Sequence, residues 1–257
     1  MTRLPGISAL LVDLEGTVYE DGRIVPGAAE ALAAAAARGI PHAFVTNTTG
    51  RPRATVAREL SGMGLDVPVD RIFTAPLAAL AYLRRRAYTR CHLLVRPALR
   101  EDLPGIQPDE EAPQAVLLGD MGEETTFARL NAAFRNVLAG AQLVTLARNR
   151  YWRAKDGLVL DVGAFAAALE YATGRSAHLV GKPSPEFFSA ALSSLGAAPE
   201  RTIVVGDDLE SDVAGAQAAG MRGVLVRTGK FRASDLDGSP IRPDAVLDSL
   251  ADLPRLL

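Results

Sequence analysis

Acidic, hydroxyl and ammonium groups stand at the ends of four apolar runs in this sequence. Asp13 closes "LLVD", and the further groups are Thr46-Asn47 in "HAFVTN", Lys182 in "AHLVGKP", and Asp207-Asp208 in "RTIVVGDD" with Asp212 just beyond. Carboxylates crowded in a cleft repel one another and resist desolvation unless cations compensate. Lys182 supplies one positive charge, and oxygen-rich ligands of this kind suit Mg²⁺. Together these groups could bind and transfer a phosphoryl group: a carboxylate, a hydroxyl, a lysine and Mg²⁺.

The chemistry expected of such a site is nucleophilic attack on phosphorus. Asp13 would form an aspartyl phosphate, while Lys182 and Mg²⁺ stabilise the equatorial oxygens and Thr46 donates a hydrogen bond. Each residue also has a purely structural explanation, as a turn cap, a helix cap, a solvated loop lysine or a helix-start acid. For one residue alone that explanation is preferred. Four such groups at successive strand ends favour a site instead.

The elements that must position these groups alternate between strand and helix. Strands are expected at 7–13, 42–47, 71–75, 177–183, 201–208 and 221–229, and helices at 26–39, 51–64, 76–86, 184–196 and 211–220. This alternation predicts an α/β fold with a doubly wound parallel sheet, which binds ligands at the carboxyl ends of its strands. Residues 88–176 contain their own set of expected strands and helices, with a polar, proline-rich linker. They predict a smaller inserted α/β domain, so that 1–87 and 177–257 form the core.

Composition excludes several classes of protein. The chain has 257 residues and a net charge of −2, so it offers no basic field for nucleic acid. No apolar run approaches the ~18 residues that span a bilayer, and the short apolar start does not indicate a signal peptide. The one cysteine, Cys91, rules out an internal disulfide and suits a reducing cytoplasm. Arginine greatly outnumbers the three lysines, Lys155, Lys182 and Lys230, which makes each lysine worth examining for a special task.

Four segments, "DLEGT", "VTNT", "GKPSPEFF" and "GDDLESD", resemble in order the motifs of the haloacid dehalogenase (HAD) superfamily of phosphatases. The insertion between the second and third segments resembles the family's C2 type of cap. The resemblance implies Asp13 as nucleophile and Mg²⁺ ligand, Lys182 as a bridge between nucleophile and phosphate, and Thr46 with the Asn47 amide as phosphate-binding groups. It further implies Asp207 and the Glu15 carbonyl as Mg²⁺ ligands, Asp212 as an outer-sphere support, and Leu14 as part of the phosphate-binding loop.

Glu15 departs from the family pattern. Most HAD phosphatases have at that position an Asp that protonates the leaving group and later activates water. Glu is longer by one C–C bond, about 1.5 Å, so its carboxyl would overshoot the same point unless the side chain folds back. General acid–base catalysis is worth roughly 10²–10⁴ in rate, and its loss matters least when the leaving group departs unaided. We therefore favour the interpretation that only the Glu15 carbonyl is needed.

The resulting hypothesis is a cytoplasmic, Mg²⁺-dependent phosphohydrolase that acts on small phosphorylated compounds with labile or good leaving groups. It would bind neither nucleic acid nor membrane, and a homodimer is compatible with the sequence. One alternative is a dedicated inorganic pyrophosphatase or phosphoramidate phosphatase. Another is a regulatory protein that binds a phosphoryl ligand with little turnover because of Glu15. A response-regulator receiver fits less well, since its acidic pair precedes its phosphoacceptor and it lacks an inserted domain.

Overall fold

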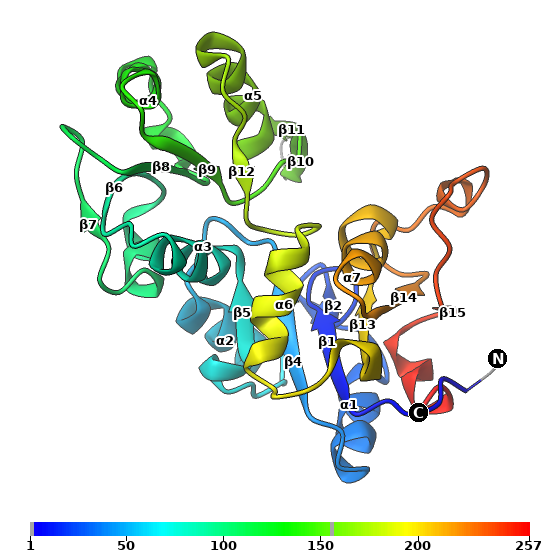
Figure 1. Cartoon of the computed structure of the whole chain (residues 1–257). Coiled ribbons are helices and arrows are strands. Elements are labelled where there is room, and N and C mark those ends of the chain that lie inside the picture. The colour runs from blue at the N-terminus through cyan, green and yellow to red at the C-terminus, as the bar shows by residue number, and fades with distance from the viewer. Residues whose placement is uncertain (1–2, 155–156) are drawn as a thin grey trace. The chain divides into compact units, whose positions relative to one another are not determined.

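The computed structural model describes residues 3–154 and 157–257 and divides into two compact units of interleaved segments (Figure 1). The first unit contains Met1–Thr46, Ala54–Phe73 and Lys182–Leu257. The second contains Asn47–Arg53 and Thr74–Gly181. The chain therefore leaves the first unit and returns to it more than once.

A six-stranded sheet forms the centre of the first unit. Its strands, in spatial order, are β15 (Ala245–Leu247), β14 (Arg222–Val226), β13 (Thr202–Gly206), β1 (Ala9–Asp13), β4 (His42–Thr46) and β5 (Ile72–Thr74). Strand β1 pairs in parallel with β13 and with β4, and all five of its residues are buried. Burial on both faces explains why its sequence is a continuous apolar run rather than an alternating one.

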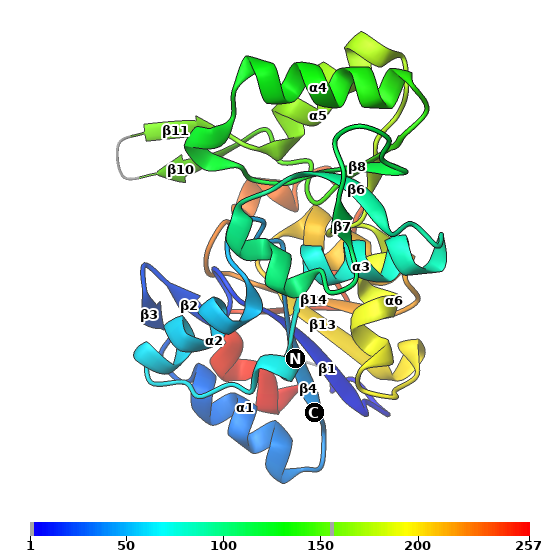
Figure 2. The same cartoon turned by 90° about the vertical axis from the view of Figure 1, so that its left-hand side faces the viewer.

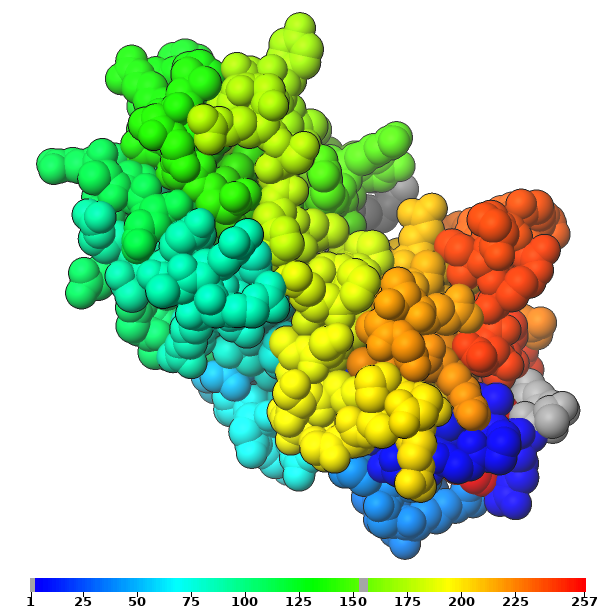
Figure 3. Space-filling model, in the orientation of Figure 1, coloured from blue at the N-terminus to red at the C-terminus, as the bar shows by residue number. Residues whose placement is uncertain are grey.

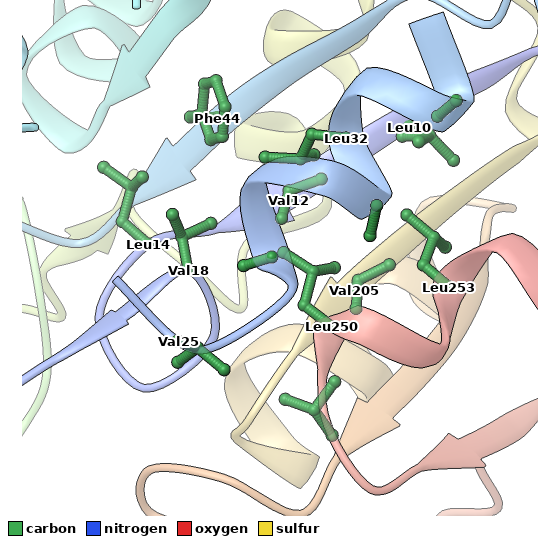
Figure 4. Close-up of a cluster of buried hydrophobic side chains, with 14 of the residues drawn as sticks. Leu10, Val12, Leu14, Val18, Val25, Leu32, Phe44, Val205, Leu250 and Leu253 are labelled. Atoms are coloured by element: carbon green, nitrogen blue, oxygen red, sulfur yellow. The ribbon is translucent and has the colours of Figure 1, made fainter. Parts of the chain in front are cut away.

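Helices cover this sheet. They are α1 (Ala28–Ala37), α2 (Arg53–Gly62), α6 (Pro185–Ser193) and α7 (Gly215–Ala218), with a π-helical turn over Leu209–Ala214 and a 3₁₀-helix over Leu250–Arg255. Helix α1 buries Ala28, Ala31, Leu32 and Ala35, the i, i+3, i+4, i+7 spacing of one apolar face. Figure 4 shows Leu32 of α1 and Leu250 of the 3₁₀-helix packed over Val12 and Val205 of the sheet.

The second unit contains a five-stranded sheet in the order β12 (His178–Leu179), β9 (Gln142–Thr145), β8 (Ala115–Leu118), β6 (Arg90–Leu94) and β7 (Gln107–Pro108). Helices α4 (Phe127–Leu138) and α5 (Val162–Thr173) lie side by side and bury Val137 and Ala166 against Val116 and Leu118 (Figure 2). An antiparallel hairpin, β10 (Tyr151–Ala154) with β11 (Gly157–Leu160), precedes α5. Across the described residues, no helix combines the length and the apolar character that crossing a bilayer requires.

The predicted α/β class with a parallel, helix-covered core sheet is confirmed, but one strand belongs elsewhere. The run "AHLVGKP" was expected in the core sheet, whereas its strand β12 pairs with β9 of the second sheet. Helix α3 (Ala75–Arg85) also belongs to the second unit, where Tyr82 stacks on His178 with ring centroids 4.2 Å apart. The observed second unit therefore begins before residue 88 and ends after 176. An apolar run predicts a buried parallel strand but does not specify which sheet it joins.

Candidate active site

Three of the expected residues lie at the carboxyl ends of neighbouring parallel strands in the first unit. Asp13 is the last residue of β1, Thr46 is the last of β4, and Asp207 follows the last residue of β13. All three are buried, with exposed fractions of 6%, 9% and 2%. Because β13, β1 and β4 are parallel and adjacent, their ends meet at one edge of the sheet, where this class of fold binds ligands.

Lys182 lies between two of the carboxylates. Its Nζ donates to Asp13 Oδ1 at 2.5 Å and to Asp212 Oδ1 at 2.7 Å, and the side chain is almost fully buried. The lysine was expected at the end of a core strand. It instead follows β12 of the second sheet and stands just before α6. Lys182 thus lies among the carboxylates, as expected, but the strand before it belongs to the other sheet.

The segment after β13 gives two aspartates different roles. Asp208 caps the π-helical turn, because its Oδ1 accepts from the amides of Glu210 at 3.0 Å and Ser211 at 2.9 Å. Asp212 lies within that turn, and its carboxyl sits where a Cβ on Gly206 would come within 2.2 Å of it. The turn therefore directs Asp212 back against the strand end, and single π-helical turns are frequent at functional sites.

Asp13, Asp207 and Asp212 form the one group of buried carboxylates, among the residues described, whose ligand atoms all lie within 4.8 Å of one another. Burial, with the neighbouring carboxylates of Asp13 and Asp212, raises the pKa of Asp207 to about 7. Burial also raises the pKa of Asp212, although Lys182 opposes that shift. Burial alone would lower the pKa of Lys182, but the charges of Asp13 and Asp212 raise it, so the ammonium stays charged.

This charge balance fits a divalent cation. Within the part of the chain that the structure describes, the ammonium of Lys182 is the one positive charge in direct contact with the buried carboxylates, and one positive charge does not neutralise three carboxylates. A cation at the cluster would favour the ionised form of Asp207 and lower the cost of its burial. Carboxylate oxygens are the donors that Mg²⁺ takes in proteins.

Three other predicted residues lie outside this cluster. The Glu15 side chain is exposed, and its main chain pairs with Tyr19 in an isolated bridge. The Leu14 side chain is buried in the hydrophobic core, which leaves only its main chain for a ligand. Asn47 begins the second unit, where its Oδ1 would lie 2.8 Å from a Cβ placed on Gly181.

Further residues, to which the sequence alone assigns no role, contact these carboxylates. Thr17 is fully buried, and its hydroxyl donates to Asp13 Oδ2 at 3.4 Å. The loop after β14 contributes Thr228, Gly229 and Lys230, and the amide of Lys230 donates to Asp207 Oδ2 at 2.6 Å. Two features of the sequence could have indicated Lys230. Lysine is rare in this chain, and "RTGKF" follows a strand, β14, that pairs with β13.

Lys230 adds a second positive charge near the carboxylates. Lys230 is exposed at the surface; partial desolvation alone would lower its pKa, but the carboxylates of Asp207, Asp13 and Asp208 raise it. With Asp207 it lines an open cleft of about 630 Å³ on the first unit. A second cation therefore stands beside the acidic cluster. Lys155 lies outside the described residues.

Comparison with known proteins identifies the family of the chain. The family described as haloacid dehalogenase-like hydrolase matches residues 10–107, and a HAD-hydrolase-like family matches 179–253. The chain is 44% identical over 231 residues to haloacid dehalogenase-like hydrolase domain-containing protein 2 of Bos taurus, covering 90% of this chain and 88% of that protein. It is 36% identical over 261 residues to phospholysine phosphohistidine inorganic pyrophosphate phosphatase of Homo sapiens, covering 99% and 96%.

Solved structures share this fold, and one of them is named a phosphatase. The 4-nitrophenylphosphatase of Thermotoga maritima superimposes with a TM-score of 0.92 at 31% identity, over 98% of both chains. NagD of E. coli K-12 superimposes with a TM-score of 0.89 at 29% identity, again over 98% of both. From the ordered motifs, the buried carboxylate–lysine cluster and this similarity along nearly the whole chain, we conclude that the protein belongs to the haloacid dehalogenase-like hydrolase family and is a phosphatase with an inserted cap.

Proposed function

We propose that this phosphatase hydrolyses small phosphorylated compounds through an aspartyl phosphate on Asp13, with Mg²⁺ as cofactor, in the cytoplasm. The observation that supports this most directly is the buried Lys182 ammonium, which donates to Asp13 and Asp212 beside the third carboxylate, Asp207. An ammonium in this position orients the Asp13 carboxylate and offers positive charge where a phosphoryl group would arrive. The proposed site is otherwise made of Thr46, the Asn47 amide and the main chain at Leu14 and Glu15.

The proposed reaction has two steps. A carboxylate oxygen of Asp13 attacks phosphorus, the bond from phosphorus to the leaving group breaks, and the leaving group departs with its electron pair. Water then attacks the phosphorus of the aspartyl phosphate, which releases inorganic phosphate and regenerates the Asp13 carboxylate. Lys182 and the Thr46 hydroxyl hold the phosphoryl oxygens in both steps.

Asp13, Asp207 and the Glu15 carbonyl are the groups proposed to hold Mg²⁺, with Asp212 behind them. When bound, the ion would supply positive charge that offsets the charge on the phosphoryl oxygens. Burial, followed by the neighbouring carboxylates of Asp13 and Asp212, raises the pKa of Asp207. A cation would offset both the desolvation and the repulsion, which is the physical reason for expecting it.

Hydrolysis of p-nitrophenyl phosphate tests the proposal. The purified protein should release p-nitrophenol in MgCl₂, and excess EDTA should lower the rate by about 100-fold or more, with recovery on adding MgCl₂ back. Undiminished activity after EDTA treatment would defeat the Mg²⁺ assignment. Phosphate binding with no turnover on any ester would favour the regulatory, phosphoryl-binding alternative instead.

Glu15 sets the expected range of leaving groups. Its side chain is exposed and lies outside the carboxylate cluster, which supports a role for its carbonyl alone. Without a positioned acid, the enzyme should favour aryl phosphates, acyl phosphates and N–P bonds over alkyl and sugar phosphates. Glu15→Asp should therefore raise kcat/KM for an alkyl phosphate by up to ~10² and hardly change it for an aryl phosphate.

Glu15→Gln is the matched control, since it keeps the size and the carbonyl but removes the acidic proton. We expect kcat/KM to stay within about twofold of wild type on both substrates. A loss of ~100-fold on the alkyl phosphate alone would identify Glu15 as a working general acid.

Inorganic pyrophosphate is the second candidate substrate. The relative whose name includes inorganic pyrophosphate phosphatase aligns over 99% of this chain at 36% identity. Phosphate is a good leaving group, so pyrophosphate also fits a site without a general acid. Measuring kcat/KM for pyrophosphate beside p-nitrophenyl phosphate would decide between a dedicated pyrophosphatase and a broader enzyme.

A further inference from the structure

The loop after β14 contacts the turn after Asp13 and the Asp207 carboxylate through three consecutive residues, 228–230, which we call the clasp. Thr228 Oγ1 donates to the Gly16 carbonyl at 2.5 Å, and the Gly229 amide donates to the Glu20 carboxylate. The third bond is the one from the Lys230 amide to Asp207 Oδ2. The clasp thus joins two segments more than 200 positions apart in the chain, both within the first unit.

The clasp also encloses Asp207. Gly16 and Gly229 have φ angles of +89° and +63°, and a Cβ on either would come within 2.1 Å of Asp207 Oδ2. A Cβ on Gly229 would also lie 2.5 Å from Gly16 Cα. Two main-chain segments therefore touch this carboxylate directly, which only glycine permits at these positions.

The turn around Gly16 sets the direction of the Glu15 carbonyl, and Thr228 holds the next peptide group. The Gly16 amide donates to the Tyr19 carbonyl at 2.8 Å, and the Gly16 carbonyl accepts from Thr228. Since a trans peptide is planar, the Glu15 C=O points opposite to the Gly16 N–H. The two peptide groups on either side of Gly16 are thus both held, one by the turn itself and one by Thr228.

We propose that Thr228 is a positioning residue for Mg²⁺ binding. Its hydroxyl holds Gly16, and through Gly16 it keeps the Glu15 carbonyl and the Asp207 carboxylate in place for the ion. This inference rests on the proposed function, because the Mg²⁺ assignment belongs to it. The segment that continues from the clasp, orange-red in Figure 3, lies at the surface, and Thr228 itself is half-buried.

Two substitutions at Thr228 separate the effect of the hydroxyl on Mg²⁺ binding from the effect of the side chain's shape. Thr228→Val keeps the shape and removes the hydrogen bond, whereas Thr228→Ser keeps the hydroxyl. Titrating MgCl₂ into each metal-free protein and following the rise in Tm yields an apparent Kd without any turnover. The Val variant should bind Mg²⁺ roughly tenfold more weakly, the effect of one hydrogen bond of about 1.4 kcal/mol, and the Ser variant should stay within about threefold of wild type.

The outcomes separate this inference from the function on which it rests. A Val variant with a lower metal-free Tm but the wild-type Kd would show a merely structural role for Thr228 and overturn the proposal. If the wild type shows no Mg²⁺-dependent rise in Tm, the Mg²⁺ assignment and this inference fail together. If Thr228→Val does not fold, Thr228→Ala removes the same hydroxyl with a smaller side chain, and an unchanged Kd there would equally overturn the proposal.

Discussion

Asp13→Asn should lower kcat on p-nitrophenyl phosphate by about 10³-fold or more while leaving the protein folded. An amide does not attack phosphorus at a useful rate, so no aspartyl phosphate can form. The fold should survive because Lys182 keeps its bond to Asp212 and the new side chain has the same size. Steady-state turnover, with circular dichroism to verify folding, measures both parts of the result.

Asp208→Asn is the matched control for this change. Asp208 caps the π-helical turn through two amides, and Asn is an equally good N-cap. The control should therefore keep kcat within about twofold of wild type. If Asp13→Asn kept more than about a tenth of wild-type kcat, covalent catalysis by Asp13 would be ruled out.

Lys182→Met should damage both turnover and stability. The substitution leaves three buried carboxylates within 4.8 Å of one another and removes the ammonium that donates to two of them. Removing one partner of a buried ion pair costs about 3–5 kcal/mol, because the remaining charge stays desolvated. The loss of positive charge at the phosphoryl site should lower kcat by about 10²–10³. Urea unfolding and steady-state turnover measure the two effects.

A second substitution separates the two effects. The double variant Lys182→Met, Asp212→Asn has one fewer buried carboxylate without a cation. Its free energy of unfolding should therefore lie between those of Lys182→Met and the wild type. Turnover should remain low, since the ammonium is still missing. Equal stability of Lys182→Met and wild type would show that these carboxylates are not held by Lys182.

Much of the site follows from the sequence because it depends on local structure. A continuous apolar run predicts a buried parallel strand, and its last residue lies at the carboxyl edge of the sheet. This reasoning leads to Asp13, Thr46 and Asp207 without knowledge of the tertiary structure. The structure brings Asp13, Asp207, Asp212 and Lys182 together, while the catalytic and ligand roles of these residues stay predictions.

The division of the chain into units depended on the tertiary structure. The run around β12 has the composition of a core strand, yet it pairs with β9, and α3 joins the same unit. Parallel strands in either sheet are apolar and covered on both faces, so composition does not distinguish the two sheets. Which sheet a strand joins depends on packing partners far away in the chain.

The amino-acid sequence by itself determined the α/β class, the order of the motifs and the strand-end aspartates, since all of these depend on periodicity over a few residues. Only the tertiary structure decided that Asp208 caps a helical turn, and that the loop at 228–230 contacts Gly16, Glu20 and Asp207. The Lys182–Asp13 bond joins residues 169 positions apart. Contacts over such separations depend on the paths of the intervening loops and on strand order, which no local sequence pattern specifies.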